Sequence, residues 1–330
     1  MKHIAIIAPD GQSNLSSVAC IVGSYEIFSE ANSYWEKNGH KPLYEVEIVG
    51  VSEQAVFSKG LVSIRPHTHI NSLDKTDLII IPSLAHDYES ALAGNVAMVD
   101  WLSRQYKNGA ELASMCTGAF MLASAGLLNG KVCSTHWSAV NTFSILFPNV
   151  KLRSHRTITD EAGIYTNGGA YSFLNLLVHL VEKFYDRPTA IFCAKLFQIE
   201  INREFQSIFT IFSGQKLHDD EEIKLAQQYI ESKIDEKISV DQLSSRFSIG
   251  RRNFDRRFVK ATGNTPLEYA QRVKIEAAKR AFENTRKTIN EVMYEIGYSD
   301  LKAFREVFRK ITGMSPMEYR ERYNKSVVDS

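Results

Sequence analysis

The feature that most constrains the fold of this chain is a duplication near its C-terminal end. The segment RRNFDRRFVKATGNTPLEYAQR (251–272) aligns, fifty residues later, with LKAFREVFRKITGMSPMEYRER (301–322). Nine of the 22 aligned positions are identical, and the shared glycine and proline are in register. Internal similarity at a fixed period indicates repeated copies of one supersecondary unit. The sequence therefore predicts that this part of the chain contains one folding unit twice.

Each copy has the sequence signals of two helices joined by a tight turn. Ser239 with Gln242, and Thr288 with Glu291, have the spacing of a capping box at the start of a short helix. The turn sequences FSIG and GYSD follow these helices, and each leads into a basic helix. Helix, short turn and second helix is the pattern of a helix-turn-helix motif. We therefore expect an all-α domain with two such motifs.

The second helix of each motif is expected to present polar side chains opposite its aromatic anchors. Phe254 and Phe258 fall on one face of the first of these helices, so its cations fall on the other face. Arginine pairs with guanine edges and asparagine with adenine, whereas lysine mainly contacts phosphate. An arginine-rich face on a single helix is more often only solvated, but the duplication, the caps and the turns together favour DNA binding. The predicted DNA-contacting residues are Arg251, Arg252, Asn253, Arg256 and Lys260 in the first copy and Lys302, Ala303, Arg305, Glu306, Arg309 and Lys310 in the second.

Charge is distributed unevenly along the 330 residues, although the formal net charge is only +1. Residues 1–213 hold 16 Lys and Arg against 19 Asp and Glu, a difference of −3, whereas residues 223–330 hold 22 against 15, a difference of +7. A basic end favours a polyanionic partner. We expect a first domain at 1–213, a polar linker at 214–219 and a DNA-binding domain at 220–330.

Strand and helix signals alternate in the first half of the chain. Short apolar runs read as buried strands because Gly, Pro, Ser or Asn bounds each of them. Amphipathic segments lie between the runs, and the pattern becomes helical at 170–212. This alternation predicts an α/β domain, a flavodoxin-like sandwich with a mostly parallel sheet and helices on both faces. The expected strands are HIAIIAP, YEVEIVGVS, DLIIIPS, ELASMC, KVCSTHW and GIYTNGG.

Cys116 stands where one predicted strand turns into a helix. A helix N-terminus favours a thiolate, and the backbone N–H of Thr117 would face an oxyanion formed there. The same geometry suits a bound carboxylate or carbonyl oxygen. His136 ends the next predicted strand, so it could act as a base for the thiol. Three interpretations stay open for Cys116: a ligand-pocket residue, a nucleophile, or a small buried hydrophobic side chain.

The C-terminal part resembles the DNA-binding domain of the AraC/XylS family of bacterial transcription regulators over 220–323. The most specific match is INEVMYEIGYSDLKAFREVFRKITGMSPMEYR in the second copy. The resemblance implies two recognition helices, joined by the long helix PLEYAQRVKIEAAKRAFENT. These helices would enter successive segments of the major groove, roughly 34 Å apart.

The N-terminal part resembles the DJ-1/PfpI superfamily, the class I glutamine-amidotransferase-like domains, over about residues 3–185. The match is strongest in SMCTGAFMLASAGLLNGKVCSTHW, and the order of the two domains is that of the GlxA-like regulators. Two departures lower the expectation of catalysis: Cys20 occupies the place of an acidic residue, and Ser83 and Leu84 replace a glycine pair. The candidate ligand pocket comprises Cys20, Leu84, Cys116, Thr117, His136, Trp137 and Tyr171.

These observations predict a transcription regulator that binds double-stranded promoter DNA under the control of a small-molecule effector. We expect a cytoplasmic homodimer that contacts RNA polymerase if it activates transcription. No signal peptide, membrane span, cofactor or metal site is expected, because the apolar runs are short and the four cysteines are widely spaced. The competing hypotheses are a cysteine-dependent amidase or hydratase with a DNA-binding tail, and a protein-interaction module without a ligand.

Overall fold

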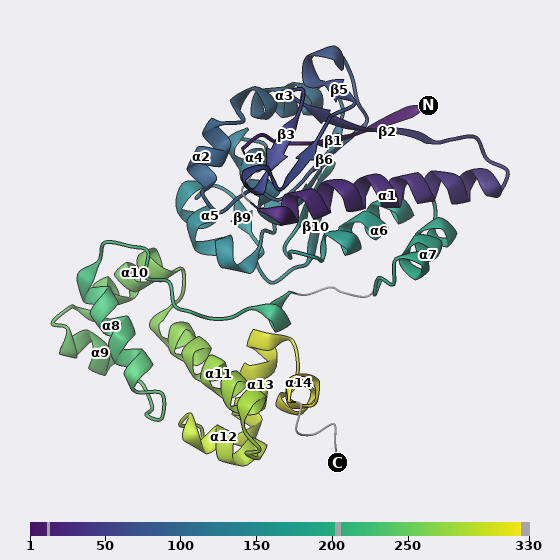
Figure 1. The fold of residues 1–330 in the computed structure, drawn as a ribbon. Coiled ribbons are helices and arrows are strands. Elements are labelled where there is room, and N and C mark those ends of the chain that lie inside the picture. Colours follow the sequence, from purple (N-terminus) through teal and green to yellow (C-terminus); the bar gives the residue numbers. More distant parts are fainter. Residues whose placement is uncertain (12–13, 202–205, 325–330) are drawn as a thin grey trace. The chain divides into compact units, whose positions relative to one another are not determined.

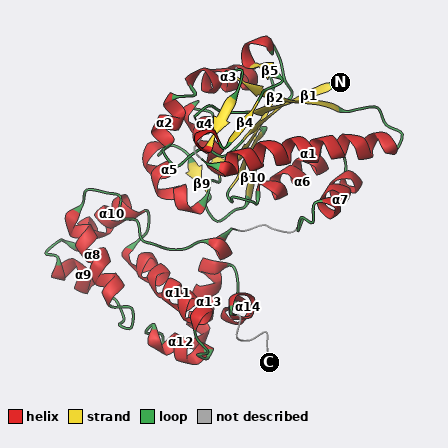
Figure 2. Cartoon of the chain, in the orientation of Figure 1, coloured by secondary structure: helices red, strands yellow, loops and turns green. Residues whose placement is uncertain are grey.

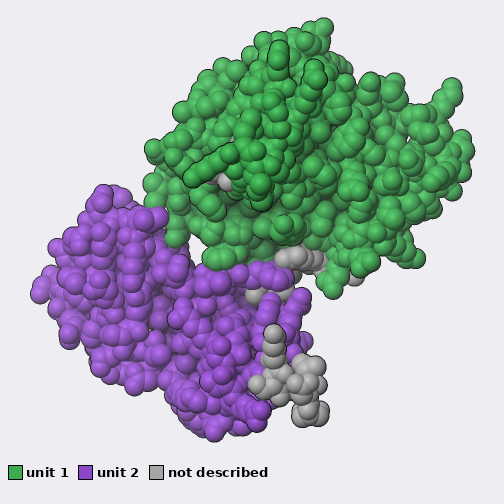
Figure 3. Space-filling model, in the orientation of Figure 1, with its two compact units in different colours: residues 1–206 green, residues 207–330 purple. Residues whose placement is uncertain are grey.

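The computed structural model describes residues 1–11, 14–201 and 206–324. Two compact units are present, Met1–Gln206 and Ser207–Ser330 (Figure 3). This division lies before the domain end predicted at residue 213. The reason is that the residues after Gln206 join the second unit: the N–H of Phe212 donates to Glu276 Oε2 at 3.1 Å, and its ring packs against the apolar core there.

A seven-stranded sheet forms the centre of the first unit (Figure 1). All neighbouring strands are parallel except for the antiparallel pair at one edge, β10 and β11. The mostly parallel α/β fold predicted from the alternating signals is therefore confirmed. In sheet order the strands are β10 (Ile158–Glu161), β11 (Ile164–Asn167), β7 (Glu111–Met115), β6 (Leu78–Ile81), β1 (Lys2–Ile7), β2 (Tyr44–Gly50) and β5 (Thr68–His69).

Helices cover both faces of this sheet, which explains why its central strands are apolar on both sides. Alternate residues of β1 enter different cores: Ile4 and Ile6 pack in one cluster, while Ala5 and Ile7 pack in the other. One face is covered by α1 (Leu15–Lys37), α6 (Phe173–Phe184) and α7 (Arg187–Leu196). The other is covered by α2 (Tyr88–Ala93), α3 (Val96–Lys107), α4 (Ala119–Ser124) and α5 (Val140–Leu146).

The segment KVCSTHW does not form the additional strand of the main sheet that its composition predicts. Only Val132–Cys133 is extended, as β8, and it pairs with β9 (Lys151–Leu152) in a separate two-stranded sheet. The chain leaves the strand because Ser134 N–H donates to the side chain of Thr166, at 2.7 Å, rather than to a neighbouring strand. A further small sheet pairs β3 (Ala55–Phe57) with β4 (Val62–Ile64).

The second unit is built from helices (Figure 2). They enclose two small cores, one around Phe254 and Phe258 and one around Phe304 and Phe308. The helices are α8 (Glu221–Ser232), α9 (Val240–Arg246), α10 (Arg251–Thr262), α11 (Pro266–Asn284), α12 (Ile289–Glu295), α13 (Leu301–Thr312) and α14 (Pro316–Tyr323). The two predicted helix-turn-helix pairs are α9 with α10 and α12 with α13.

The duplication seen in the sequence is also present in the hydrogen bonds. Both α10 and α13 end at a glycine in the left-handed conformation, with φ of 68° and 82°. In the first copy Tyr269 donates its hydroxyl to Glu231 at 2.6 Å, and in the second Tyr319 donates to Glu283 at 2.5 Å. Because Tyr269 and Glu283 both belong to α11, this one helix completes the first copy and begins the second.

Of the two predicted capping boxes in this unit, one is confirmed and one is wrong. Thr288 and Glu291 form reciprocal side-chain bonds at the start of α12. Ser239 is the N-cap of α9, but its side chain makes no capping bond. Gln242 has a neutral amide, which gains less from the positive end of a helix than a carboxylate does.

In the described parts of the chain, no helix is long and apolar enough to cross a bilayer. Within the same residues, no group of three or more His, Cys, Asp and Glu side chains is arranged to hold a metal ion.

Candidate functional site

The strand-turn-helix elbow expected at Cys116 is present at the C-terminal end of β7. Cys116 begins a single 3₁₀ turn, Cys116–Gly118, which leads into α4. Its φ is +54°, a value uncommon for a residue with a side chain. Gly118 is required by close packing, since a Cβ there would lie 2.5 Å from the carbonyl oxygen of Pro82. The backbone is therefore held in a sharp, strained turn.

Burial sets the protonation state of Cys116. The residue is only 7% exposed, and burial raises the pKa of its thiol to about 11. Hydrogen bonds from the backbone and side chain of Thr117 lower this pKa but do not outweigh burial. The helix N-terminus was expected to favour the thiolate, yet at neutral pH the group is a neutral thiol.

The hydrogen bonds of Thr117 occupy one of the backbone donors that an oxyanion hole would need. Leu84 N–H donates to Thr117 Oγ1 at 2.8 Å, and Thr117 Oγ1 donates in turn to the carbonyl oxygen of Leu84 at 2.8 Å. Both residues are buried. An oxyanion hole requires donors that point at the developing charge. Here the N–H of Leu84 points at a side chain instead.

His136 is placed as the cap of a short turn rather than as a base for the thiol. Its Nδ1 accepts from the backbone N–H of Ser138 at 3.3 Å and lies 2.7 Å from the Ser138 hydroxyl. An imidazole nitrogen that accepts from an N–H carries no proton, so the proton of the neutral ring is on Nε2. Burial and, secondarily, nearby His86 lower the pKa of His136. Among the hydrogen bonds of the described residues, none joins this ring to Cys116.

Cys20 approaches Cys116 from the first turns of α1. It is 1% exposed, and burial raises the pKa of its thiol to about 12. Hydrogen bonding with Ser83 lowers this pKa, and the proximity of Cys116 raises it further. The position expected from the family resemblance to hold a carboxylate thus holds a second neutral thiol.

Sequence reasoning missed two side chains that lie close to this site. His86 Nδ1 is 3.3 Å from the hydroxyl of Tyr88, and His86 is near enough to His136 to lower its pKa. Burial and the nearby thiol of Cys116 raise the pKa of Tyr88 to about 12, and its ring stacks on Phe120. Their signal was available in SLAHDY (83–88), which follows β6 after Pro82; β6 is the neighbour of β7, the strand that precedes Cys116.

The two aromatic residues predicted for the pocket lie in different surroundings. Trp137 is half-buried beside His136, with ring centroids 5.3 Å apart. Tyr171 is 68% exposed and leans against Phe173, so its ring lies at the surface.

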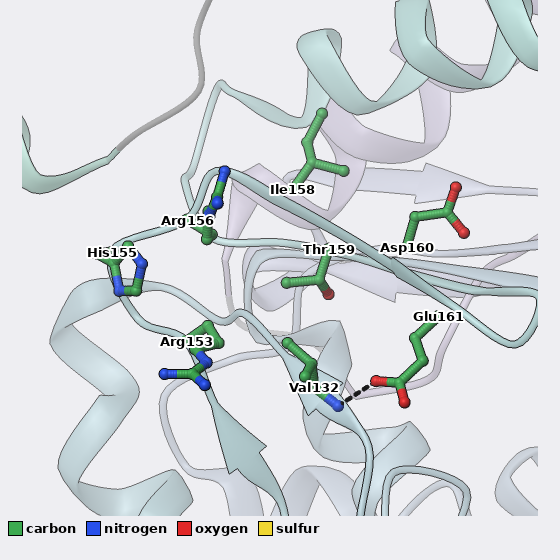
Figure 4. A pocket seen from close by; sticks show the side chains of 8 residues that line it. All are labelled: Val132, Arg153, His155, Arg156, Ile158, Thr159, Asp160 and Glu161. Atoms are coloured by element: carbon green, nitrogen blue, oxygen red, sulfur yellow. Dashed lines mark hydrogen bonds between the residues drawn. The ribbon is translucent and has the colours of Figure 1, made fainter.

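An open hollow of about 690 Å³ is found in another part of the first unit (Figure 4). Glu161 closes one side of it by accepting the N–H of Val132 at 2.6 Å. Cys116 does not line this hollow. The residues that do are Val132, Arg153, His155, Arg156, Ile158, Thr159, Asp160 and Glu161.

In the second unit, α10 exposes the polar face predicted for DNA contact. Arg252, Asn253, Arg256 and Lys260 are exposed, whereas the two phenylalanines of the helix are fully buried. Arg256 donates to Asn253 Oδ1 at 3.0 Å, so these two side chains form one unit on the surface. Arg251 is already paired with two carboxylates, those of Asp241 at 2.5 Å and Asp255 at 3.0 Å.

Arg257 is a structural residue that the sequence analysis did not single out. Its guanidinium contacts Asp220 and Glu222, each at 2.6 Å, and these hydrogen bonds raise its pKa. Both acids stand at the start of α8, so the contact fixes α10 to α8. The acidic DDEE segment therefore binds a cation of the recognition helix rather than remaining free in solution.

The polar face of α13 differs from that of α10. Lys302, Arg305, Glu306, Arg309 and Lys310 are exposed and Ala303 is half-buried. Within the described residues, no ion pair shorter than 4.0 Å neutralises any of these four cations. The second helix accordingly exposes four cations without an ion-pair partner in the described part of the chain, beside the carboxylate of Glu306.

Each half of the chain matches the model of a known protein family. Residues 25–183 match the model of the DJ-1/PfpI family, and residues 243–322 match that of a helix-turn-helix domain. The HTH-type transcriptional regulator GbdR of Pseudomonas aeruginosa is 23% identical over 282 residues, 85% of this chain and 76% of its own length. The HTH-type transcriptional regulator CdhR of the same species is 22% identical over 317 residues, 92% of this chain and 88% of its own length.

Solved structures agree on the fold of the first unit. A protein from Vibrio parahaemolyticus, described as a candidate transcriptional regulator, superposes with a TM-score of 0.52 at 24% identity, covering 59% of this chain and 98% of its own. A THiJ/PfpI family protein from Pseudomonas syringae superposes with a TM-score of 0.50 at 17% identity, covering 60% and 75%.

Proposed function

We propose that this chain joins a DJ-1/PfpI-type domain to an AraC-type helix-turn-helix domain and that it is a sequence-specific DNA-binding regulator of transcription. The observation that carries the proposal is the doubled helix-turn-helix unit, in which α10 and α13 each bury two phenylalanines and expose a cationic face. Two recognition helices on one polypeptide can contact two neighbouring segments of the major groove. The relatives that span most of this chain are named as transcriptional regulators.

Selection from a random-sequence DNA pool with the full chain tests this function. We expect enrichment of a two-part site whose halves are roughly 34 Å apart, one helical turn. A variant with Arg256→Ala and Arg305→Ala in the two recognition helices serves as the control and should enrich the site poorly. Retention of all sequences to the same extent would refute sequence-specific regulation.

The first unit is proposed to bind the small-molecule effector near Cys116 and to form the dimer. Cys20, Cys116 and His136 are all neutral at physiological pH because burial disfavours their charged forms, which suits an uncharged or weakly polar ligand group. A thermal-shift screen with metabolites would detect such a ligand, since binding to the folded state raises the melting temperature. Cytoplasmic location and contact with RNA polymerase during activation belong to the same proposal.

A cysteine-dependent hydrolase is the competing function, favoured by the positive φ of Cys116. Strained backbone of this kind is found at nucleophiles. Three observations argue against hydrolysis by Cys116. They are the raised pKa of its thiol, the N–H of Leu84 that is bonded to a side chain, and the proton on His136 Nε2. Release of ammonia or another product from a panel of amides and isocyanides, lost in Cys116→Ser, would establish the enzyme instead.

A further inference from the structure

Gln206, the last residue of the first unit, is fastened inside that unit. It is 1% exposed, and its Nε2 donates to the carbonyl oxygens of Thr135 at 3.0 Å and Ser154 at 2.6 Å. Its backbone N–H donates to the carbonyl oxygen of His155 at 3.0 Å. A buried amide with several partners is held in one orientation, because losing any of these bonds leaves a polar group unsatisfied. The exit point of the chain is therefore fixed, not loosely tethered.

Thr135 connects this anchor directly to the elbow. Its side-chain hydroxyl donates to the carbonyl oxygen of Cys116 at 3.0 Å, and the residue is fully buried. The carbonyl oxygen of Thr135 is one of the acceptors that hold Gln206. A single residue thus separates the strained peptide of Cys116 from the amide that ends the first unit.

The segment that follows, residues 207–212, is fastened to α11 of the second unit by a buried ion pair. Lys279 Nζ contacts Glu276 Oε2 at 2.7 Å, and the two residues are only 4% and 8% exposed. Lys279 also donates to the carbonyl oxygen of Thr210 at 2.5 Å, and Glu276 accepts the N–H of Phe212 at 3.1 Å. A buried pair is tolerated only when further hydrogen bonds satisfy it. Here the backbone of segment 207–212 supplies them.

The attachment lies on the helix that both DNA-binding copies share. The ring of Phe212 packs edge-on against Tyr269 in the first copy, with centroids 5.2 Å apart. Lys279 stands within 5.9 Å of the ring of Tyr319, in the second copy. Any displacement of segment 207–212 therefore acts on α11 between its contacts with the two helix-turn-helix motifs.

We propose that residues 206–212 transmit the state of the Cys116 elbow to α11 and so link effector binding to the DNA-binding form of the protein. A ligand that alters the elbow would change the Thr135–Gln206 anchor, and the segment would carry that change to the Glu276–Lys279 pair. The effect of this coupling on DNA binding rests on the proposed function. Its effect on the protein alone does not. Coupling of this kind is reciprocal. A change at the Cys116 elbow must therefore alter the Glu276–Lys279 pair, and a change at that pair must alter the elbow.

Hydrogen exchange on the full chain tests the physical link without DNA. Thr135→Val removes the hydroxyl bound to Cys116 and should raise amide exchange in 207–212 by about fivefold or more, a factor typical of allosteric coupling. In the other direction, Lys279→Met should raise exchange in 132–136. Thr76→Val, which removes a buried hydroxyl bonded to His3, is the control for the first substitution. Lys274→Met, on α11 but without a bond to the segment, is the control for the second.

Exchange that changes only at the substituted end, or equally in the controls, would overturn the proposal. Melting temperatures identify any variant that is globally unfolded, and for such a variant the milder Glu276→Gln or Thr135→Ser replaces it. Because these measurements use no DNA, their failure is distinct from a failure of the regulator function.

A lengthened chain tests the consequence for DNA. With the site found by selection, Thr135→Val should change the Kd by about fivefold in the normal chain, within the usual range of coupling. Inserting Gly-Ser-Gly-Ser between Gln206 and Ser207 should abolish this difference, because a flexible insertion no longer transmits displacement. If Thr135→Val has the same effect with the insertion, or none without it, the segment does not couple the units. If no chain binds any sequence selectively, the proposed function itself has failed.

Discussion

Single residues decide whether the elbow acts as a reactive centre. At Cys116, burial raises the pKa of the thiol by more than the helix N-terminus lowers it. The sequence correctly placed a cysteine at a sharp turn, because strand and helix signals adjoin there. It could not reveal that Leu84 N–H would be taken by Thr117 or that Ser138 would fix the ring of His136. Those contacts depend on how separate loops meet at the sheet edge, which no local sequence pattern encodes.

Alkylation of Cys116 should show the pH dependence of an unreactive thiol. With its pKa near 11, about one molecule in 3,000 carries the thiolate at pH 7.5, compared with about one in ten for an unperturbed cysteine. The thiolate is the reactive form, so the iodoacetamide labelling rate should rise about tenfold per pH unit up to pH 10. Mass spectrometry of the peptide containing Cys116 measures this rate, with Cys116→Ser as the blank. A rate that levels off near pH 7 would contradict the neutral thiol.

Arg257 and Arg252 lie on the same helix, but we expect the loss of Arg257 to affect stability and the loss of Arg252 to affect DNA binding. Arg257 makes charge-assisted bonds to two carboxylates of α8, so Arg257→Ala should lower the free energy of unfolding by about 1 kcal/mol. Arg252 is exposed, so Arg252→Ala should leave stability nearly unchanged and weaken DNA binding. Urea denaturation and DNA titration of both variants measure the two effects. Equal losses of stability would show that Arg257 is not a structural contact.

At the scale of helices and strands, local signals predicted the fold well wherever one short segment contained the whole signal. The buried runs of β1 and β6, and the duplicated helices with their glycine ends, were readable because period, length and turn residues agree. The prediction that KVCSTHW forms a strand of the main sheet was wrong because the N–H of Ser134 bonds to a side chain of β11 instead of to a neighbouring strand. No local pattern encodes that contact. The division between the compact units lies earlier than the boundary expected at residue 213, since Phe212 is attached to α11 by a contact that the polar sequence after it does not indicate.

The two recognition helices should contribute unequally to the salt dependence of DNA binding. Arg251 on α10 is already paired with Asp241 and Asp255, whereas Arg305 on α13 has no such partner among the described residues. Each phosphate neutralised contributes roughly 0.9 to the slope of log K against log salt. Arg305→Ala should therefore reduce this slope by about 0.9, and Arg251→Ala should reduce it less. Binding isotherms at several salt concentrations measure both slopes, and a larger loss for Arg251→Ala would reverse the assignment.

For the DNA-binding unit as a whole, the essential property is the fixed relation between its two copies. Lys274 in the middle of α11 is 8% exposed and donates to the carbonyl oxygens of Glu236 at 2.9 Å and Ile296 at 2.8 Å. Glu236 precedes α9 of the first copy, and Ile296 ends α12 of the second. Burial lowers the pKa of this lysine, and two carbonyl acceptors satisfy its ammonium group. One side chain thus ties the turn before the first helix-turn-helix motif to the turn between the two helices of the second.

Removing that ammonium should loosen the spacing that the protein requires between its half-sites. Lys274→Met retains most of the apolar stem but leaves two carbonyl oxygens without a donor, so the free energy of unfolding should fall by roughly 1 to 3 kcal/mol. The selected DNA site, lengthened by one or two base pairs between its halves, should lose less affinity for this variant than for the parent protein. Lys287→Met, which removes an exposed ion pair with Glu295, is the matched control and should keep the parental preference. An unchanged spacing preference in Lys274→Met would mean that the packing of α11 alone, through Tyr269 and Phe282, sets the distance between the recognition helices.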